Sequence, residues 1–183
     1  MWRATLLAGA MLAMGFGFIG TTRAADEAPA ASAAKLEKDD MKFVRSANAG
    51  GEMEVALGKL AADKASNADV KAFGQKMVDD HSKANEELGK LASSKGVDLT
   101  KGKENRQKKI DAKVEDLSKK TGSDFDKAYV DDMVEDHEKD VKEFKKQAET
   151  AKDEDLKKWA AQTLPTLEEH LKMIKDIQSK MKS

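Results

Sequence analysis

The sequence contains no cysteine among its 183 residues. Disulfide bonds, thiolate metal ligands, a cysteine nucleophile and an N-terminal cysteine that carries lipid are therefore all excluded. Proline and aromatic residues are also scarce, with 2 prolines and 5% aromatics. Strands rely on β-branched and aromatic residues, so this composition is poor material for a β-sheet. The length suits one domain of ordinary size, and the scarcities favour an all-helical one.

Long apolar runs are confined to residues 1–24, which are predicted to be a cleavable signal peptide. Arg3 supplies the positive charge, Leu6 to Ile19 is apolar, and Thr22 and Ala24 are the small residues of a cleavage site after Ala24. The apolar run is shorter than the roughly 20 residues that a membrane-spanning helix needs, which favours cleavage over an uncleaved anchor. We therefore expect a mature protein that has no membrane span and is periplasmic or secreted.

The mature chain has no strong charge of either sign. Arg3 and Arg23 are removed with the signal peptide, so 31 of the 33 basic residues and all 34 acidic residues remain. No basic field exists to recruit nucleic acid, and the sequence leaves a homo-oligomer open while identifying no other partner. The alanine-rich residues 25–38 are predicted to be a disordered lead, and residues 39–183 the folded domain.

Within residues 39–183, apolar residues recur at the three-and-four spacing of amphipathic helices. A first long helix is predicted over about 40–64, and a short amphipathic one over about 104–119. Three more long helices are predicted from their capping residues, and they end near residues 94, 151 and 181. Their predicted caps are Ser66 or Asn67, then Ser123, then Asp153.

The loops near residues 65 and 152 are only a few residues long, so each pair of long helices should form an antiparallel hairpin. The connector over 97–122 is long enough to travel the length of a bundle. The predicted fold is therefore all-α: a ferritin-like four-helix bundle of two antiparallel hairpins, with a long crossover that contains a short extra helix.

The three histidines lie on three different long helices, at His81, His137 and His170. Met77, Met133 and Ile174 stand one turn away from them, so each histidine lies on an apolar, inward-facing stripe. The helix without a histidine carries Glu54 on its own inward stripe, three residues before Leu57.

These four side chains are predicted to lie at similar levels along the bundle. Counted from the hairpin turns, His137 and His170 lie roughly 23 and 26 Å along their helices, and Glu54 and His81 roughly 17 and 24 Å. Helical side chains lean toward their own N-terminus, and this lean narrows both differences. We therefore expect three imidazoles and one carboxylate to converge inside the bundle.

Neutral imidazoles with a carboxylate form a good ligand set for Zn, Fe or Cu. Glu54, His81, His137 and His170 are therefore the predicted metal ligands. The adjacent Asp80, Asp136 and Glu169 are predicted to accept hydrogen bonds from the ligands or to supplement them. The alternative interpretation is that the histidines are hydrogen-bonded core residues in a non-catalytic scaffold for interactions in the cell envelope or under stress.

Several motifs occur in order along the chain and cover about Met41 to Ile177. They are Gly51–Gly58, the run FGQKMVDDHSKAN at 73–85, Tyr129–His137 and the run LPTLEEHL at 164–171. They resemble a family of exported bacterial proteins of unknown function (domain of unknown function 4142), often labelled predicted outer-membrane proteins. The resemblance implies a ferritin-like four-helix fold and an envelope location, without an established activity. The motif positions that it carries over are Glu54, His81, His137 and His170.

Di-iron ferritins use Glu-x-x-His on two helices. Here Val78, Val134 and Leu167 stand three residues before the histidines, which favours a histidine-rich site for one metal ion over a carboxylate-rich di-iron centre. A metal-dependent redox enzyme would need an open coordination position and a substrate pocket, and neither is visible in the sequence. No Ser-His-Asp arrangement, phosphate loop or nucleotide fingerprint is present. The sequence thus favours a binding protein over an enzyme.

Overall fold

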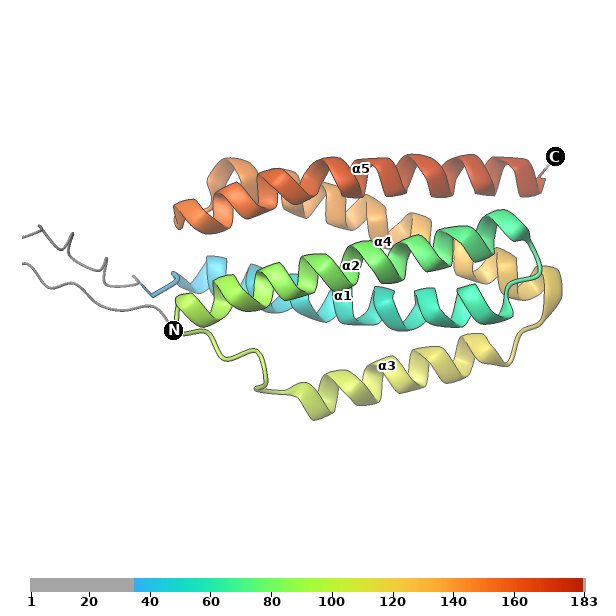
Figure 1. The fold of residues 1–183 in the computed structure, drawn as a ribbon, viewed down its shortest axis with the longest axis horizontal. Coiled ribbons are helices and arrows are strands. Elements are labelled where there is room, and N and C mark those ends of the chain that lie inside the picture. The colour runs from blue at the N-terminus through green and yellow to red at the C-terminus, as the bar shows by residue number, and fades with distance from the viewer. Residues whose placement is uncertain (1–34, 183) are drawn as a thin grey trace, which may run out of the picture. The chain divides into compact units, whose positions relative to one another are not determined.

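Residues 35–182 are the part of the chain that the computed structural model describes, and they form five helices and no strand (Figure 1). The prediction of an all-α bundle is confirmed. The predicted signal peptide and residues 25–34 of the predicted lead lie outside the described residues. The helices are α1 (Lys38–Lys64), α2 (Ala68–Ser94), α3 (Lys103–Ser118), α4 (Gly122–Thr150) and α5 (Glu154–Lys182).

Two antiparallel hairpins, α1–α2 and α4–α5, make up the bundle, and the crossover that joins them carries α3 along its outside (Figure 1). The predicted caps are confirmed at Asn67, whose Oδ1 accepts hydrogen bonds from two amides of α2, and at Asp153, which accepts from Leu156 N at 3.0 Å. The predicted Ser123 cap is wrong. Helix α4 already begins at Gly122, and Thr121, in the cap position, makes no side-chain hydrogen bond.

A buried aspartate from the opposite hairpin holds each hairpin turn. Asp126 on α4 accepts hydrogen bonds from the backbone amides of Ser66 and Asn67 at 3.0 and 2.8 Å. Asp40 on α1 accepts from the amides of Lys152 and Asp153 at 3.0 and 2.9 Å. The loop amides would otherwise lack partners, and charge-assisted hydrogen bonds are the stronger kind. Each carboxylate therefore holds the turn of one hairpin against the first helix of the other hairpin.

The hairpin α1–α2 packs closely because glycine faces glycine. A Cβ atom at Gly58 would lie 2.7 Å from the Gly74 carbonyl oxygen, and one at Gly74 would lie 2.8 Å from the Ala62 amide nitrogen. Real Cβ atoms essentially never approach so closely. This approach brings the α1 residues near position 54 close to the α2 residues near position 81.

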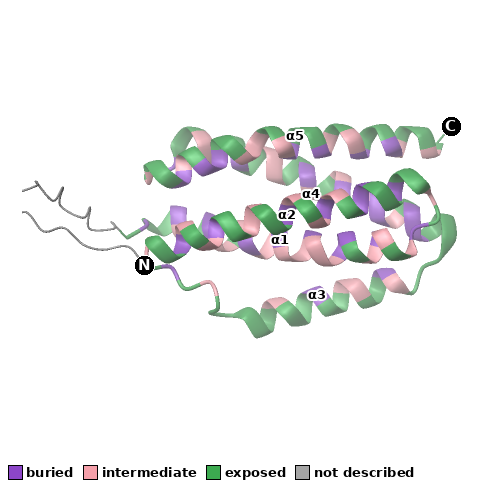
Figure 2. Ribbon diagram, in the orientation of Figure 1, coloured by how far each residue is buried: buried purple, intermediate pink, exposed green. Residues whose placement is uncertain are grey.

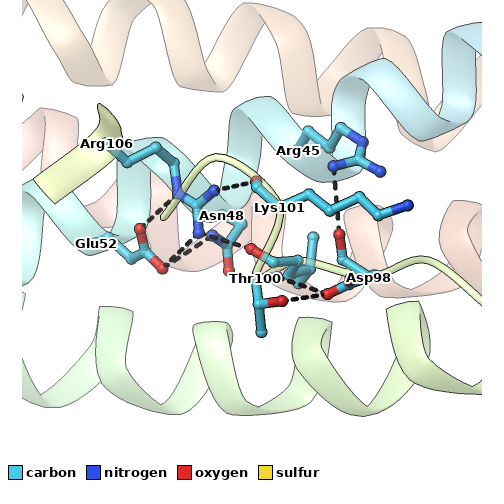
Figure 3. A network of polar contacts seen from close by, with 8 residues as sticks. Arg45, Asn48, Glu52, Asp98, Thr100, Lys101 and Arg106 are labelled. Atoms are coloured by element: carbon cyan, nitrogen blue, oxygen red, sulfur yellow. Dashed lines mark hydrogen bonds and ion pairs between the residues drawn. The ribbon is translucent and has the colours of Figure 1, made fainter. Parts of the chain in front are cut away.

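The crossover is fastened to α1 by a polar network centred on Arg106 (Figure 3). Arg106 Nε donates to Glu52 at 2.8 Å, and the same guanidinium donates to the carbonyl oxygens of Leu99 and Lys101. Lys113, further along α3, pairs with Asp132 of α4 at 2.6 Å. Helix α3 is largely exposed and buries little besides Ile110 and Leu117, so it lies on the bundle as an outer layer (Figure 2).

The apolar core is divided into two clusters along the bundle axis. One cluster lies near the α1–α2 turn and the other near the α4–α5 turn. Between them, each of the four long helices contributes one buried titratable side chain. These side chains are Glu54, His81, His137 and His170, and we call them the polar layer.

Candidate metal centre

The polar layer brings together the four residues that the sequence analysis predicts as metal ligands. Glu54 comes from α1, His81 from α2, His137 from α4 and His170 from α5. Their exposed fractions are 3%, 6%, 0% and 0%. These side chains are almost completely withdrawn from water, so each needs polar partners inside the protein.

The three imidazole rings form a tight group. One ring nitrogen from each histidine lies within 4.8 Å of the corresponding nitrogens of the other two. The ring centroids are 5.4 to 5.7 Å apart. Phe73 packs edge-on against His137 and His170 at 6.1 and 6.2 Å, so an apolar side chain closes one side of the group.

One nitrogen of each ring is held by an oxygen atom. His81 Nδ1 lies 3.0 Å from Glu54 Oε2, and His170 Nε2 lies 2.7 Å from Asp80 Oδ2. His137 Nδ1 lies 2.9 Å from the Met133 carbonyl oxygen. A carbonyl oxygen can only accept, so His137 carries its proton on Nδ1 and donates it there. An oxygen partner of this kind fixes the tautomer and orientation of a metal-binding histidine.

The other nitrogen of each ring is buried and has no hydrogen-bond partner in the described part of the chain. These atoms are His81 Nε2, His137 Nε2 and His170 Nδ1. Glu54 Oε1 is also buried without a hydrogen bond, 3.6 Å from His137 Nε2. Buried polar atoms are nearly always satisfied, so four such atoms in one small region call for an explanation.

Electrostatics acts differently on His81, which is paired with Glu54, and on the other two rings. Burial alone would raise the pKa of Glu54, but the charges of the histidines, His81 above all, hold it below its usual value. Burial opposes a charge on His81 as well, yet Glu54 raises its pKa. Burial lowers the pKa of His137, and it lowers that of His170 to about 4. Glu54 therefore favours the charged form of His81, while burial favours the neutral forms of His137 and His170.

The two neutral rings each present a lone pair on their unpartnered nitrogen. Since His137 donates from Nδ1 to Met133, its Nε2 carries a lone pair. His170 donates from Nε2 to Asp80, which leaves a lone pair on Nδ1. On His81, loss of one proton from Nε2 would expose a third. The arrangement is chemically suited to bind an electrophile, such as a metal ion, at the centre of the three rings.

Of the three acidic residues predicted beside the ligands, one contacts a histidine and two do not. Asp80 contacts an imidazole, as predicted, although the imidazole is that of His170 on α5 and not that of its chain neighbour. Asp136 and Glu169 form no hydrogen bond or ion pair with a histidine among residues 35–182. The Glu169 side chain is 61% exposed and pairs with Lys76 at 3.6 Å, and Asp136 lies 3.9 Å from Lys139. Both diverge because a residue next to an inward-facing one is rotated by about 100° around the helix.

One further acidic residue beside the polar layer was missed by the sequence analysis. Burial and the negative charge of Glu54 raise the pKa of Asp140 to about 8. The same two causes raise the pKa of Asp136 above its usual value. Asp140 lies three residues after His137 and four after Asp136, so helical spacing alone indicated that it flanks the site.

The fold and this site define a class: an all-α bundle whose core is interrupted by buried histidines from three helices. The chain matches the family described as Domain of unknown function (DUF4142) over residues 25–177, and it belongs to that family. The resemblance seen in the sequence is thereby confirmed at the level of the family. No curated protein and no solved structure matches the chain. Among the described residues, no helix has the length and apolarity that crossing a membrane requires.

Proposed function

We propose that this protein is exported to the cell envelope and there binds one transition-metal ion between His81, His137 and His170. The observation that carries the proposal is the group of three buried ring nitrogens without partners. Each belongs to a ring whose second nitrogen is held by an oxygen atom. A metal ion would satisfy all three nitrogens at once, and it would be oriented by the oxygen atoms behind the rings.

The donor set selects the class of metal. Imidazole nitrogens suit Zn, Cu and Fe, whereas Ca and Mg prefer oxygen ligands. Bonds of about 2.1 Å would place two nitrogens on one zinc ion about 3.4 Å apart. One nitrogen from each histidine lies within 4.8 Å of one from each of the other two, so side-chain movements of about 1 Å would suffice. Glu54 would balance part of the ion's charge, and its free Oε1 is available as a fourth ligand.

The chemistry of this chain's own residues is then the binding and orientation of the ion. His137 and His170 are already neutral and need only shift toward it. His81 would give up the Nε2 proton, and Glu54 would keep its hydrogen bond to Nδ1. The site lies in the core, which would shield a bound ion from water. These properties support holding or buffering a metal, and the signal-peptide pattern of residues 1–24 supports doing so outside the cytoplasm.

The test is metal analysis of residues 25–183, purified from the periplasm and also reconstituted after chelation with Zn²⁺, Co²⁺, Cu²⁺ or Fe²⁺. We expect close to one ion per chain, and none in the His81→Gln/His137→Gln/His170→Gln variant. Glu169→Gln is the control, because it removes an exposed acidic side chain next to His170. A folded wild-type protein that binds none of the four ions would contradict the proposal and leave the helical scaffold with structural histidines.

Export has its own test. Expression of the full chain in a bacterial host should yield periplasmic protein whose N-terminal residue is Ala25. A cytoplasmic protein that retains Met1 would contradict the envelope location while leaving the metal proposal untouched.

A further inference from the structure

A hollow of about 500 Å³ opens between α1 and α4, beside α3. Gly50 and Glu54 line it from α1, Asp136 and Asp140 from α4, and Lys113 from α3. Glu54 thus belongs both to the wall of this hollow and to the polar layer. It is the one residue of the polar layer that lines the hollow.

Two lysines pair with some of the carboxylates of the hollow but do not neutralise all of them. Lys113 pairs with Asp132 at 2.6 Å, and Lys139 pairs with Glu135 at 2.7 Å. Asp140 has no ion pair or hydrogen bond among residues 35–182, and the ion pair of Asp136 with Lys139 is a long one, at 3.9 Å. The pKa of Asp140 is raised to about 8, so this side chain is largely uncharged at neutral pH. The remaining carboxylates of the hollow still outnumber its two lysines, and the resulting negative potential attracts cations.

Glu54 connects this negative hollow to the histidines. Its side chain is 4% exposed, Oε2 is engaged with His81 Nδ1, and Oε1 has no hydrogen-bond partner. The free Oε1 lies 3.6 Å from His137 Nε2, which is itself without a partner. A cation bound to Oε1 would therefore lie close to His137 Nε2.

The opposite side of the polar layer is less suited to a cation. Lys76 stands there, paired with both Asp80 and Glu169 at 3.0 and 3.6 Å. Between α1 and α2, the Asn85 side chain fills the space against Gly51. Phe73 and the apolar clusters close the bundle along its axis.

We propose that the hollow between α1 and α4 is the entrance through which a metal cation reaches the histidines, with Asp136 attracting the ion and Glu54 passing it to His137. This inference rests on the proposed function and adds the route and the residues that control the rate of binding. It predicts that changes in the hollow alter how fast the metal enters and leaves more than how tightly it is held.

A steric plug tests the route. Gly50 lines the hollow, and a Cβ atom there meets nothing within 4 Å, so Gly50→Leu should fold normally and obstruct the opening. Gly89→Leu is the matched control, because Gly89 on α2 also has open space and lies away from the hollow. Stopped-flow mixing with Zn²⁺, followed by mixing the loaded protein with excess chelator, should show entry and release both slowed about tenfold in Gly50→Leu, with an unchanged Kd.

Removal of charge tests the attraction. Asp136→Asn should slow Zn²⁺ association several-fold at low salt and neutral pH, and it should reduce the dependence of this rate on ionic strength. Glu169→Gln removes the same charge from the other side and should bind at the wild-type rate. The entrance proposal is overturned if either hollow variant binds and releases Zn²⁺ at wild-type rates. Wild-type protein that binds no Zn²⁺ at equilibrium overturns both the entrance and the proposed function.

Discussion

The polar layer and the two apolar clusters that flank it are built on the same four helices, yet they satisfy their side chains in different ways. In the clusters, the burial of apolar side chains such as Phe73 and Leu156 stabilises the fold, and these side chains need no hydrogen-bond partner. In the polar layer, every buried nitrogen and oxygen needs a partner, and four atoms have none. These unpartnered atoms are the observation on which the proposed metal site rests.

The strongest way to sharpen this comparison is to supply the polar layer with a metal ion. A ligand at a thousand times its Kd stabilises the folded state by about 4 kcal/mol when it binds only that state. We expect an increase of this order in the free energy of unfolding when Zn²⁺ is added to the apoprotein, measured by urea denaturation. The triple histidine variant should show no increase; an equal one would place the stabilising ion elsewhere.

The next comparison replaces the polar layer with apolar side chains. Replacing buried ionic groups with well-packed hydrophobic residues is often neutral or stabilising by about 1–4 kcal/mol. We expect Glu54→Leu/His81→Leu/His137→Leu/His170→Leu to match or exceed the apoprotein in thermal unfolding and to lose metal binding. If this variant is markedly less stable, the histidines contribute to stability, as the scaffold interpretation requires.

Overpacking one apolar cluster should lower stability without altering the metal centre directly. In Gly74→Ala, the new methyl group would meet the Ala62 amide and the Gly58 carbonyl at 2.8 Å, so α1 and α2 must separate. Such strain typically costs about 1–3 kcal/mol. Gly89→Ala on the same helix meets open space and should gain about 0.5–1 kcal/mol from helix propensity. Chemical denaturation of both variants measures the contrast, and equal effects would disprove the close approach.

The oxygen partners of the rings should matter to the metal more than to the fold. Asp80→Asn should weaken metal affinity about 10–100-fold, because the partner of His170 Nε2 loses its charge. Asp79→Asn, its chain neighbour, accepts only from Gln75 on the same helix and should leave affinity unchanged. Competition with a chelator of known affinity provides the measurement. Equal losses in both variants would point to a general charge effect.

The smallest expected effect concerns Asp140 and pH. Its pKa is raised to about 8, chiefly by burial and the charge of Glu54, with Asp136 and Glu143 acting in the same direction and His81 against them. The folded state therefore holds this proton where the unfolded chain has lost it. The contribution to stability is complete below about pH 4 and is lost as pH rises through about 8.

Asp140→Asn mimics the protonated form, so we expect it to exceed the wild-type apoprotein in stability by about 1–2 kcal/mol at pH 9 and by little at pH 4. The exposed Glu149, also on α4, provides the control substitution Glu149→Gln, which should show no such trend. Thermal unfolding across this pH range gives the comparison. A constant difference between wild type and Asp140→Asn would contradict the raised pKa.

Much of the site was predictable because helical geometry is regular. The positions of His81, His137 and His170 on apolar stripes, with a rise of about 1.5 Å per residue, were enough to predict that the rings meet. The role of Glu54 followed from the same count. The count did not predict which histidine Asp80 contacts. The choice between His81 and His170 depends on how α2 is rotated against α5. Asp136 and Glu169 were misjudged for the same reason.

The sequence by itself determined the helices, the two hairpins, the level of the polar layer and the family. These depend on local spacing, on loop length and on the types of the residues, all of which can be read along the chain. The tertiary structure decided which nitrogen of each imidazole is held and which is free, and it placed Asp140 and Gly50 around a hollow that ends at Glu54. These depend on rotations of about one residue between neighbouring helices, which only the packing of side chains across the core can set.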